Sequence, residues 1–386
     1  IKAEDHKILN KNDCYLGQDY LREFSHFGID VLFTQHSGAI WYPMVYEYED
    51  IRMKENAKKV KTRLLESFVD TVNTIKPTFV VPYAGPPCFL GDDCFKFNFE
   101  ENGIFPDQHD FAPKIENKII SKYNMMMPND DLIIDTQGSI KFENFNHFDF
   151  ERKEELLKEY QKKRLPYINN YLQNIPEPKN DLYEKFDEYF KKLINQNKYF
   201  SSSVDQIVEF QIVGKYGGIW QINFKDSPVK ISKEKIGEAE YRFTINSKYM
   251  NLILNDKINW EDFLLSLRLK IWRKPDIYNG ALFALLQYGR DPILCQRADN
   301  TDLKSKCPTT TINVQYNNKM YKIQRSCPHL GENLKNSTIR NGILVCPRHQ
   351  WKFDLNLKGK CVSGGDKDLP IYSITDIDES ENTGCA

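Results

Sequence analysis

The alternation of hydrophobic and polar positions predicts an α/β layer at the start of the chain. Residues 29–33 form a short apolar run before a polar, Gly-containing stretch, which is typical of a buried strand that ends in a turn. Residues 50–75 are rich in Lys, Glu and Leu with apolar residues at helical spacing, and predict an amphipathic helix. Residues 78–85 are β-branched and aromatic and stop at Pro and Gly, which predicts a second buried strand.

The pattern changes twice in the rest of the chain. Residues 151–199 are strongly charged with helical spacing and predict a connecting helical pair. Strand patterning over 210–245, followed by helical spacing over 248–286, predicts a compact α+β unit. The polar residues 296–306 carry little apolar surface and predict a linker before a final strand-rich part.

Composition narrows the class of protein. A chain of 386 residues allows two or three domains, and 53 Lys plus Arg against 54 Asp plus Glu leaves a net charge of -1, which disfavours a nucleic-acid-binding surface. No run reaches the roughly 20 apolar residues of a membrane helix, and no signal peptide opens the chain, so we expect a cytoplasmic protein without a membrane partner. Nine widely spread cysteines favour reduced thiols, some of them binding metal, over a disulfide framework.

The strongest chemical signal is a pair of short motifs near the carboxyl end. Cys327 and His329 form a C-x-H motif, and Cys346 and His349 form a C-x-x-H motif sixteen residues later. Two thiolates and two imidazoles are the ligands of a Rieske [2Fe-2S] cluster, in which the cysteines hold one iron and the histidines the other. The alternative is a tetrahedral zinc site, although zinc fingers normally pair like ligands within each motif.

The surrounding residues resemble the Rieske ferredoxin and oxygenase domains over about residues 307–375. The segments L-G, Q-W-K-F-D and S-G-G follow the two motifs as they do in that family. Rieske domains of respiratory complexes carry two more cysteines, and Glu332 and Arg348 stand at the corresponding positions here. The resemblance therefore implies an oxygenase-type domain that donates electrons.

Several short patches before residue 290 share a further resemblance. They are residues 6–10, 13–14, 36–39, 42–44, 81–85, 260, 267–268 and 273–278. Over about residues 5–290 these patches resemble the CMP-N-acetylneuraminate hydroxylase family. That resemblance implies a metallo-β-lactamase fold, although the family places its Rieske domain first whereas this chain has it last. The H-x-H-x-D-H metal motif of that fold does not occur in the sequence, so we expect the missing half-site upstream or on a partner chain.

The resemblance also suggests candidate ligands for an acceptor iron, mononuclear or dinuclear. Asp13 stands where the family places a metal-binding aspartate, but an aspartate before a turn is also a common cap. His36 and His109 are further candidates as iron ligands or proton shuttles, and the alternative is a hydrogen-bonded structural histidine.

Three cations are candidates for binding an anionic part of a substrate. Arg268 and Arg273 offer planar guanidinium forks and Lys274 a point charge. The alternative is a solvated helix face.

These predictions combine into a multidomain α+β and α/β chain. Residues 1–150 are expected to be the carboxyl-terminal part of a metallo-β-lactamase αββα sandwich. Residues 151–298 are expected to form a helical connector and an α+β module that resembles a sterol carrier protein, and residues 299–386 an all-β Rieske domain.

The predicted function is a Rieske-dependent iron oxygenase of the hydroxylase type, a monooxygenase. Its partners would be an electron-donating reductase, ferredoxin or cytochrome, together with O2 and a small polar substrate. One alternative is an electron-transfer protein whose hydrolase-like domain only docks a partner. Another is a metal-dependent hydrolase with a regulatory cluster.

Overall fold

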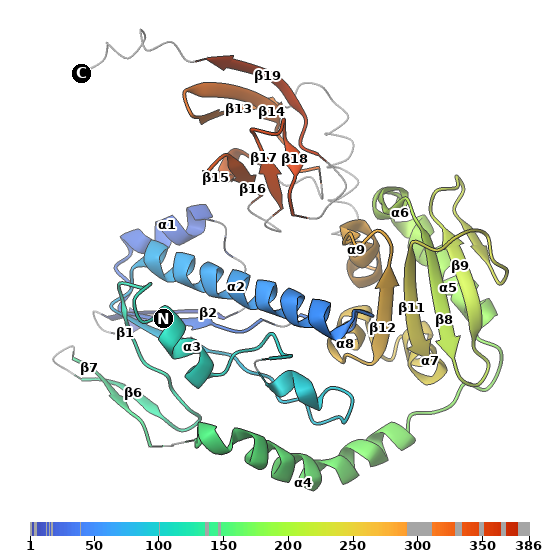
Figure 1. Cartoon of the computed structure of the whole chain (residues 1–386), viewed down its shortest axis with the longest axis horizontal. Helices are drawn as coiled ribbons and strands as arrows, with labels where there is room; N and C mark the ends of the chain where they lie inside the picture. The colour runs from blue at the N-terminus through green and yellow to red at the C-terminus, as the bar shows by residue number, and fades with distance from the viewer. Residues whose placement is uncertain are drawn as a thin grey trace. The chain divides into compact units, whose positions relative to one another are not determined.

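Figure 1 shows the elements of the chain in a computed structural model. The chain falls into two compact units. The first unit comprises Ile1–Pro176 with Leu265–Leu267, and the second comprises Glu177–Leu264 with Arg268–Ala386. The residues described by the structure are 2–3, 6–12, 14, 16, 18–38, 40–99, 101–135, 139–145, 148–291, 311–328, 334–346, 351–363 and 368–376.

The first unit contains the predicted α/β layer. Its sheet has the order β1-β2-β3-β4-β5, in which β2 to β5 are parallel and β1 is antiparallel to β2. The helix predicted over 50–75 is confirmed as α2 (Asp50–Ile75), and both predicted strands are confirmed as β3 (Val31–Gln35) and β4 (Phe79–Tyr83). The other elements are β1 (Lys2–Ala3), β2 (His6–Asn12), α1 (Gln18–His26), η1 (Phe95–Asn98), α3 (Gln108–Ile115) and β5 (Lys122–Tyr123).

Three helices cover one face of this sheet. Leu32 of β3 and Val80 of β4 are fully buried in a cluster with side chains of α1, α2 and α3. This cluster is made of side chains from one face of the strands and from one face of α2, where Phe68 and Val72 are four residues apart. Packing them together removes the apolar surface of the cluster from water. Lys76 ends α2 in the left-handed region (φ 56°) and donates its N–H to the Val72 carbonyl.

Helix α4 (Lys153–Gln173) belongs to the first unit, although the sequence predicts a domain boundary after residue 150. Its charged sequence buries no side chain, but two polar contacts attach it. Gln161 donates from Nε2 to the Leu90 carbonyl at 3.0 Å, and Lys153 pairs with Asp107 at 2.7 Å. Before it lie the antiparallel pair β6 (Asp131–Ile134) and β7 (Ile140–Glu143), and η2 (Phe150–Arg152).

The α+β unit predicted after the helical pair is present in the second unit. Its sheet has the order β10-β9-β8-β11-β12, with β8 and β11 parallel. Its strands are β8 (Ile207–Val213), β9 (Gly218–Asn223), β10 (Lys230–Ser232), β11 (Tyr241–Asn246) and β12 (Leu269–Arg273). Its helices are α5 (Tyr183–Gln196), α6 (Lys198–Val204), α7 (Ser247–Leu254), α8 (Trp260–Leu265) and α9 (Gly280–Tyr288).

The prediction of continuous helical spacing over 248–286 is wrong at β12. Leu269 and Ile271 are buried while Lys270 between them is exposed, a period of two that belongs to a strand paired with β11. The sheet packs on helices through aromatic rings: the ring centre of Phe186 lies 4.5 Å from that of Phe190 and 5.2 Å from that of Phe210.

The carboxyl-terminal part is made of short strands, as its sequence pattern predicts. One sheet has the order β13-β14-β19 and the other β15-β16-β17-β18. The strands are β13 (Thr311–Tyr316), β14 (Lys319–Gln324), β15 (Thr338–Arg340), β16 (Ile343–Val345), β17 (Lys352–Asp354), β18 (Lys360–Cys361) and β19 (Ile371–Asp376). The short 3-10 helix η3 (Leu334–Asn336) comes between β14 and β15 along the chain. Within the described part of the chain, none of the helices has the length and apolar character that crossing a bilayer requires.

Candidate metal centres

The two motif cysteines lie in one apolar cluster of the carboxyl-terminal sheets. Cys327 follows β14 and Cys346 directly follows β16, and their exposed fractions are 2% and 0%. Both pack with Leu334, Leu344 and Trp351 in the same buried cluster. Two cysteines that are nineteen residues apart in sequence therefore lie in one shared core.

Backbone hydrogen bonds fix the described chain next to both cysteines. The Cys346 N–H donates to the Trp351 carbonyl at 2.7 Å. The Leu334 N–H donates to the carbonyl of Arg325, two residues before Cys327, at 2.7 Å. A backbone held in this way helps to preorganise a metal ligand.

The donor set fits a [2Fe-2S] cluster. A thiolate ligand has to be shielded both from water and from oxidants. The sulfurs of Cys327 and Cys346 are shielded because both lie in one buried apolar cluster. The imidazole partners His329 and His349 lie outside the described residues, as do Glu332 and Arg348.

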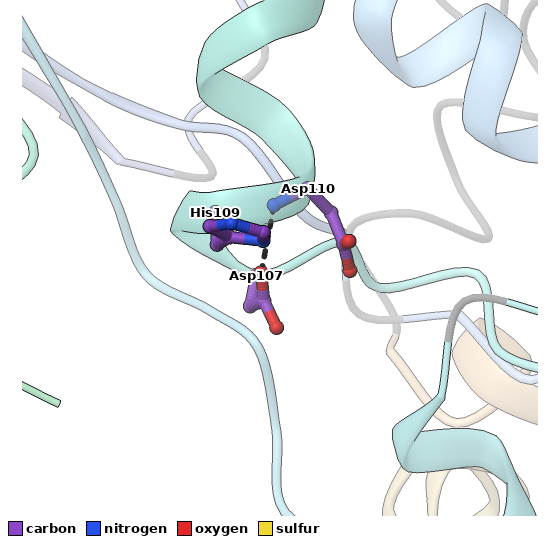
Figure 2. Close-up of side chains that lie close together, drawn as sticks. All are labelled: Asp107, His109 and Asp110. Atoms are coloured by element: carbon purple, nitrogen blue, oxygen red, sulfur yellow. Dashed lines mark hydrogen bonds between the residues drawn. The ribbon is translucent and has the colours of Figure 1, made fainter. Parts of the chain in front are cut away.

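A second group with metal-ligand chemistry lies at the start of α3 (Figure 2). Asp107, His109 and Asp110 each offer a ligand atom, and these atoms lie within 4.8 Å of one another. His109 was a candidate from the sequence, whereas the two aspartates were not. The signal for Asp107 was an aspartate directly before a helix, which is the pattern of an N-cap.

The contacts of Asp107 are those of a buried cap. One carboxylate oxygen accepts the Asp110 N–H at 2.8 Å, and the other lies 2.7 Å from the Lys153 ammonium (Figure 2 shows the former). The ring of His109 stacks on Phe150 with centres 5.5 Å apart. A metal ion at this group would compete with the ammonium of Lys153 for the charge of Asp107.

His36 is a buried histidine between two backbone carbonyls. Its Nδ1 lies 3.1 Å from the Tyr83 carbonyl and its Nε2 3.1 Å from that of Pro106. Burial lowers the pKa of His36 below its usual value, while the two carbonyls and the Asp107 charge act to raise it. Because both ring nitrogens face carbonyl oxygens, this geometry links the end of β4 to the loop before α3 and presents no nitrogen to an iron.

The remaining sequence candidates are not gathered into one site. Asp13 lies outside the described residues. Arg268 precedes β12 and Arg273 ends it, so five residues of extended chain separate their Cα atoms by roughly 16 Å. Arg273 is held by the Asp276 carboxylate at 2.7 Å and donates to the Tyr241 hydroxyl at 3.2 Å, while Lys274 is exposed.

A pocket of about 360 Å³ in the first unit opens where β3 and β4 end. The carboxyl ends of parallel strands are the usual ligand-binding edge of an α/β sheet. Its wall includes the two loops, after residues 35 and 83, that carry the hydroxylase resemblance, and it contains no charged side chain. The lining residues are Gln35, Ser37, Gly38, Ile40, Ala84, Gly85, Pro86, Pro87, Phe89, Phe105, Leu265 and Leu267.

Comparisons with known proteins agree on the carboxyl-terminal part. A family model described as the Rieske [2Fe-2S] domain matches residues 297–373. The chain is 25% identical over 378 residues to a protein of Mycolicibacterium smegmatis named for the Rieske 2Fe-2S iron–sulfur group, an alignment that covers 92% of this chain and 70% of that protein. A similarly named protein of Mycobacterium tuberculosis is 25% identical over 359 residues, which are 88% of this chain and 66% of that protein.

The chain therefore spans about two thirds of the length of these relatives, and the similarity extends well beyond the Rieske domain. Sterol carrier proteins of Helicoverpa armigera and Yarrowia lipolytica align with 30% and 19% of the chain at TM-scores of 0.25 and 0.17. These scores are too low to assign the fold of the middle module.

Proposed function

We propose, from the premise that residues 297–373 form a Rieske [2Fe-2S] domain, that this chain is the electron-transfer part of an O2-dependent oxidoreductase of the hydroxylase type. A bound [2Fe-2S] cluster supplies one-electron transfer. The observation that carries the proposal is the burial of Cys327 and Cys346 in one cluster, each in a motif that also holds a histidine.

In this proposal Cys327 and Cys346 hold one iron, and His329 and His349 hold the other. The thiolates stay in the apolar cluster, which excludes water and oxidants from the sulfurs. An electron-donating reductase, ferredoxin or cytochrome would dock near the [2Fe-2S] cluster and supply its electrons.

The finer part of the proposal is an acceptor iron in a metallo-β-lactamase-like first unit. Asp13 and His109 remain its candidate ligands, whereas both ring nitrogens of His36 already face backbone carbonyls. His109 lies beside the carboxylates of Asp107 and Asp110. The pocket at the ends of β3 and β4 would hold the small substrate, and its uncharged wall favours a neutral group there.

Iron and acid-labile sulfide in the intact protein test both parts. A Rieske cluster contains equal numbers of irons and sulfides, so iron in excess of sulfide reports an acceptor iron. We expect a Rieske-type electron paramagnetic resonance signal after reduction, and consumption of O2 that depends on reductant. A single redox-silent metal ion in place of iron and sulfide would overturn the cluster itself.

Variants of the ligands connect the signal to named residues. Cys346→Ser should abolish the cluster, whereas Cys361→Ser, a half-buried cysteine of the same domain, should keep it. His349→Cys should shift both the spectrum and the reduction potential. Unchanged values for His349→Cys would show that His349 is not a ligand.

A second candidate function is an electron carrier whose first unit only docks a partner. Two observations favour it: both nitrogens of His36 face carbonyls, and both oxygens of Asp107 are engaged. This candidate predicts iron equal to sulfide and no O2 consumption beyond slow autoxidation, whereas turnover without any reductant would favour a hydrolase.

A further inference from the structure

Ser337, which directly precedes β15, carries a buried hydroxyl. Its Oγ is shielded from solvent, and among the described residues it has no donor or acceptor in reach. A buried hydroxyl without a partner destabilises a protein, and such groups are rare unless a ligand or ion completes them. The residues around Ser337 in the Rieske domain therefore indicate which group its hydroxyl can bind.

The strand register brings Ser337 next to a cluster ligand. In the antiparallel pair of β15 and β16, Thr338 lies opposite Val345 and Ile339 opposite Leu344. One further step in the same register places Ser337 opposite Cys346. Directly opposed residues of an antiparallel pair have their side chains on the same face, with Cβ atoms about 5 Å apart.

Burial shows which face this is. Leu344 and Cys346 are both fully buried, and Ile339 packs against the same cluster. Because side chains alternate along a strand, Ser337 shares the face of Ile339, which is the face that carries the Cys346 sulfur. A short polar donor and a thiol thus share one face of an apolar core, without a hydrogen bond between them in this structure.

We propose that the Ser337 hydroxyl donates a hydrogen bond to the Cys346 thiolate when the [2Fe-2S] cluster is bound, and thereby raises its reduction potential. The inference rests on the proposed function, in which Cys346 is an iron ligand. Reduction makes the sulfur ligands more negative, so a donor stabilises the reduced state more than the oxidised one. Ser337 is a positioning residue that acts through Cys346.

The test is a potentiometric titration of the holoprotein, followed by its visible spectrum. In Ser337→Ala we expect the ratio of reduced to oxidised cluster at a fixed potential to fall about ten-fold, which for a one-electron couple is about 59 mV. Ser337→Thr keeps the hydroxyl and should restore the potential of the unmodified protein. Ser373→Ala, at an exposed position of β19 in the same domain, is the matched control and should change nothing.

A vibrational measurement gives an independent readout. Resonance Raman spectra in H2O and D2O should contain a deuterium-sensitive iron–sulfur stretch in the unmodified protein, and this sensitivity should be lost in Ser337→Ala. A potential and a deuterium effect that both survive in Ser337→Ala would overturn the inference, including the case in which only thermal stability changes. If Cys346→Ser retains full iron and sulfide, the ligand assignment itself fails, which is a different outcome.

Discussion

The ion pair between Asp107 and Lys153 holds α4 on the first unit, and its removal should release that helix. The side chains are only 6% and 17% exposed, so solvent screens the pair weakly. Asp107→Asn keeps a good N-cap for α3 but removes the charge that faces Lys153. A hydrogen bond to a charged group contributes about 1.5–3 kcal/mol to stability.

This loss of stability should be measurable as more frequent opening of α4. At about 1.36 kcal/mol for each ten-fold change, the opening of α4 should become roughly 10- to 100-fold more frequent. Asp107→Ala also removes the N-cap of α3, which should increase the loss of stability by about 1 kcal/mol. Its hydrogen exchange should therefore be faster in α3 as well as in α4. Hydrogen exchange of peptides from residues 153–173, followed by mass spectrometry, measures this opening directly.

The matched control is Glu155→Gln on the same helix. Glu155 pairs with Arg152 at 2.8 Å, but both side chains are more than half exposed, and such surface pairs contribute little. Equal exchange of α4 in Asp107→Asn and Glu155→Gln would refute the reasoning. If added Fe²⁺ slows exchange at α3 in the unmodified protein but not in Asp107→Asn, Asp107 is instead a metal ligand.

Three further perturbations follow from the structure. Burial lowers the pKa of His36. Below about pH 6.5 the unfolded chain binds a proton that the folded chain resists, so the first unit should lose stability as the pH falls. Denaturation at two pH values should show this loss of stability, and His36→Gln should remove the pH dependence. Ile40→Trp should fill the pocket and reduce turnover without changing the ratio of iron to sulfide, whereas Ile51→Trp, 75% exposed on α2, should leave turnover unchanged. Phe210→Ala should destabilise the second unit by about 3–5 kcal/mol in chemical denaturation, because it opens a cavity among stacked rings, and a loss below 1 kcal/mol would contradict that packing.

Local patterns predicted the local elements well. The helix over 50–75 came from the helical spacing of its apolar residues, because that spacing reflects which side of the helix faces the core. The strands around Leu32 and Val80 came from short apolar and β-branched runs that end at turn residues. The same reasoning failed at residues 269–273. Five residues are too few to separate a period of two from one of 3.6, and only pairing with β11 made this segment a strand.

The sequence by itself indicated a Rieske [2Fe-2S] domain at the carboxyl end, since the kind and spacing of its thiol and imidazole side chains follow from residue order. Only the tertiary structure decided which distant groups meet: Asp107 with Lys153, and His36 with the carbonyls of Tyr83 and Pro106. These contacts join residues that are far apart in the chain. Their partners depend on strand register and helix docking, which are set by the packing of the whole unit and by no local pattern.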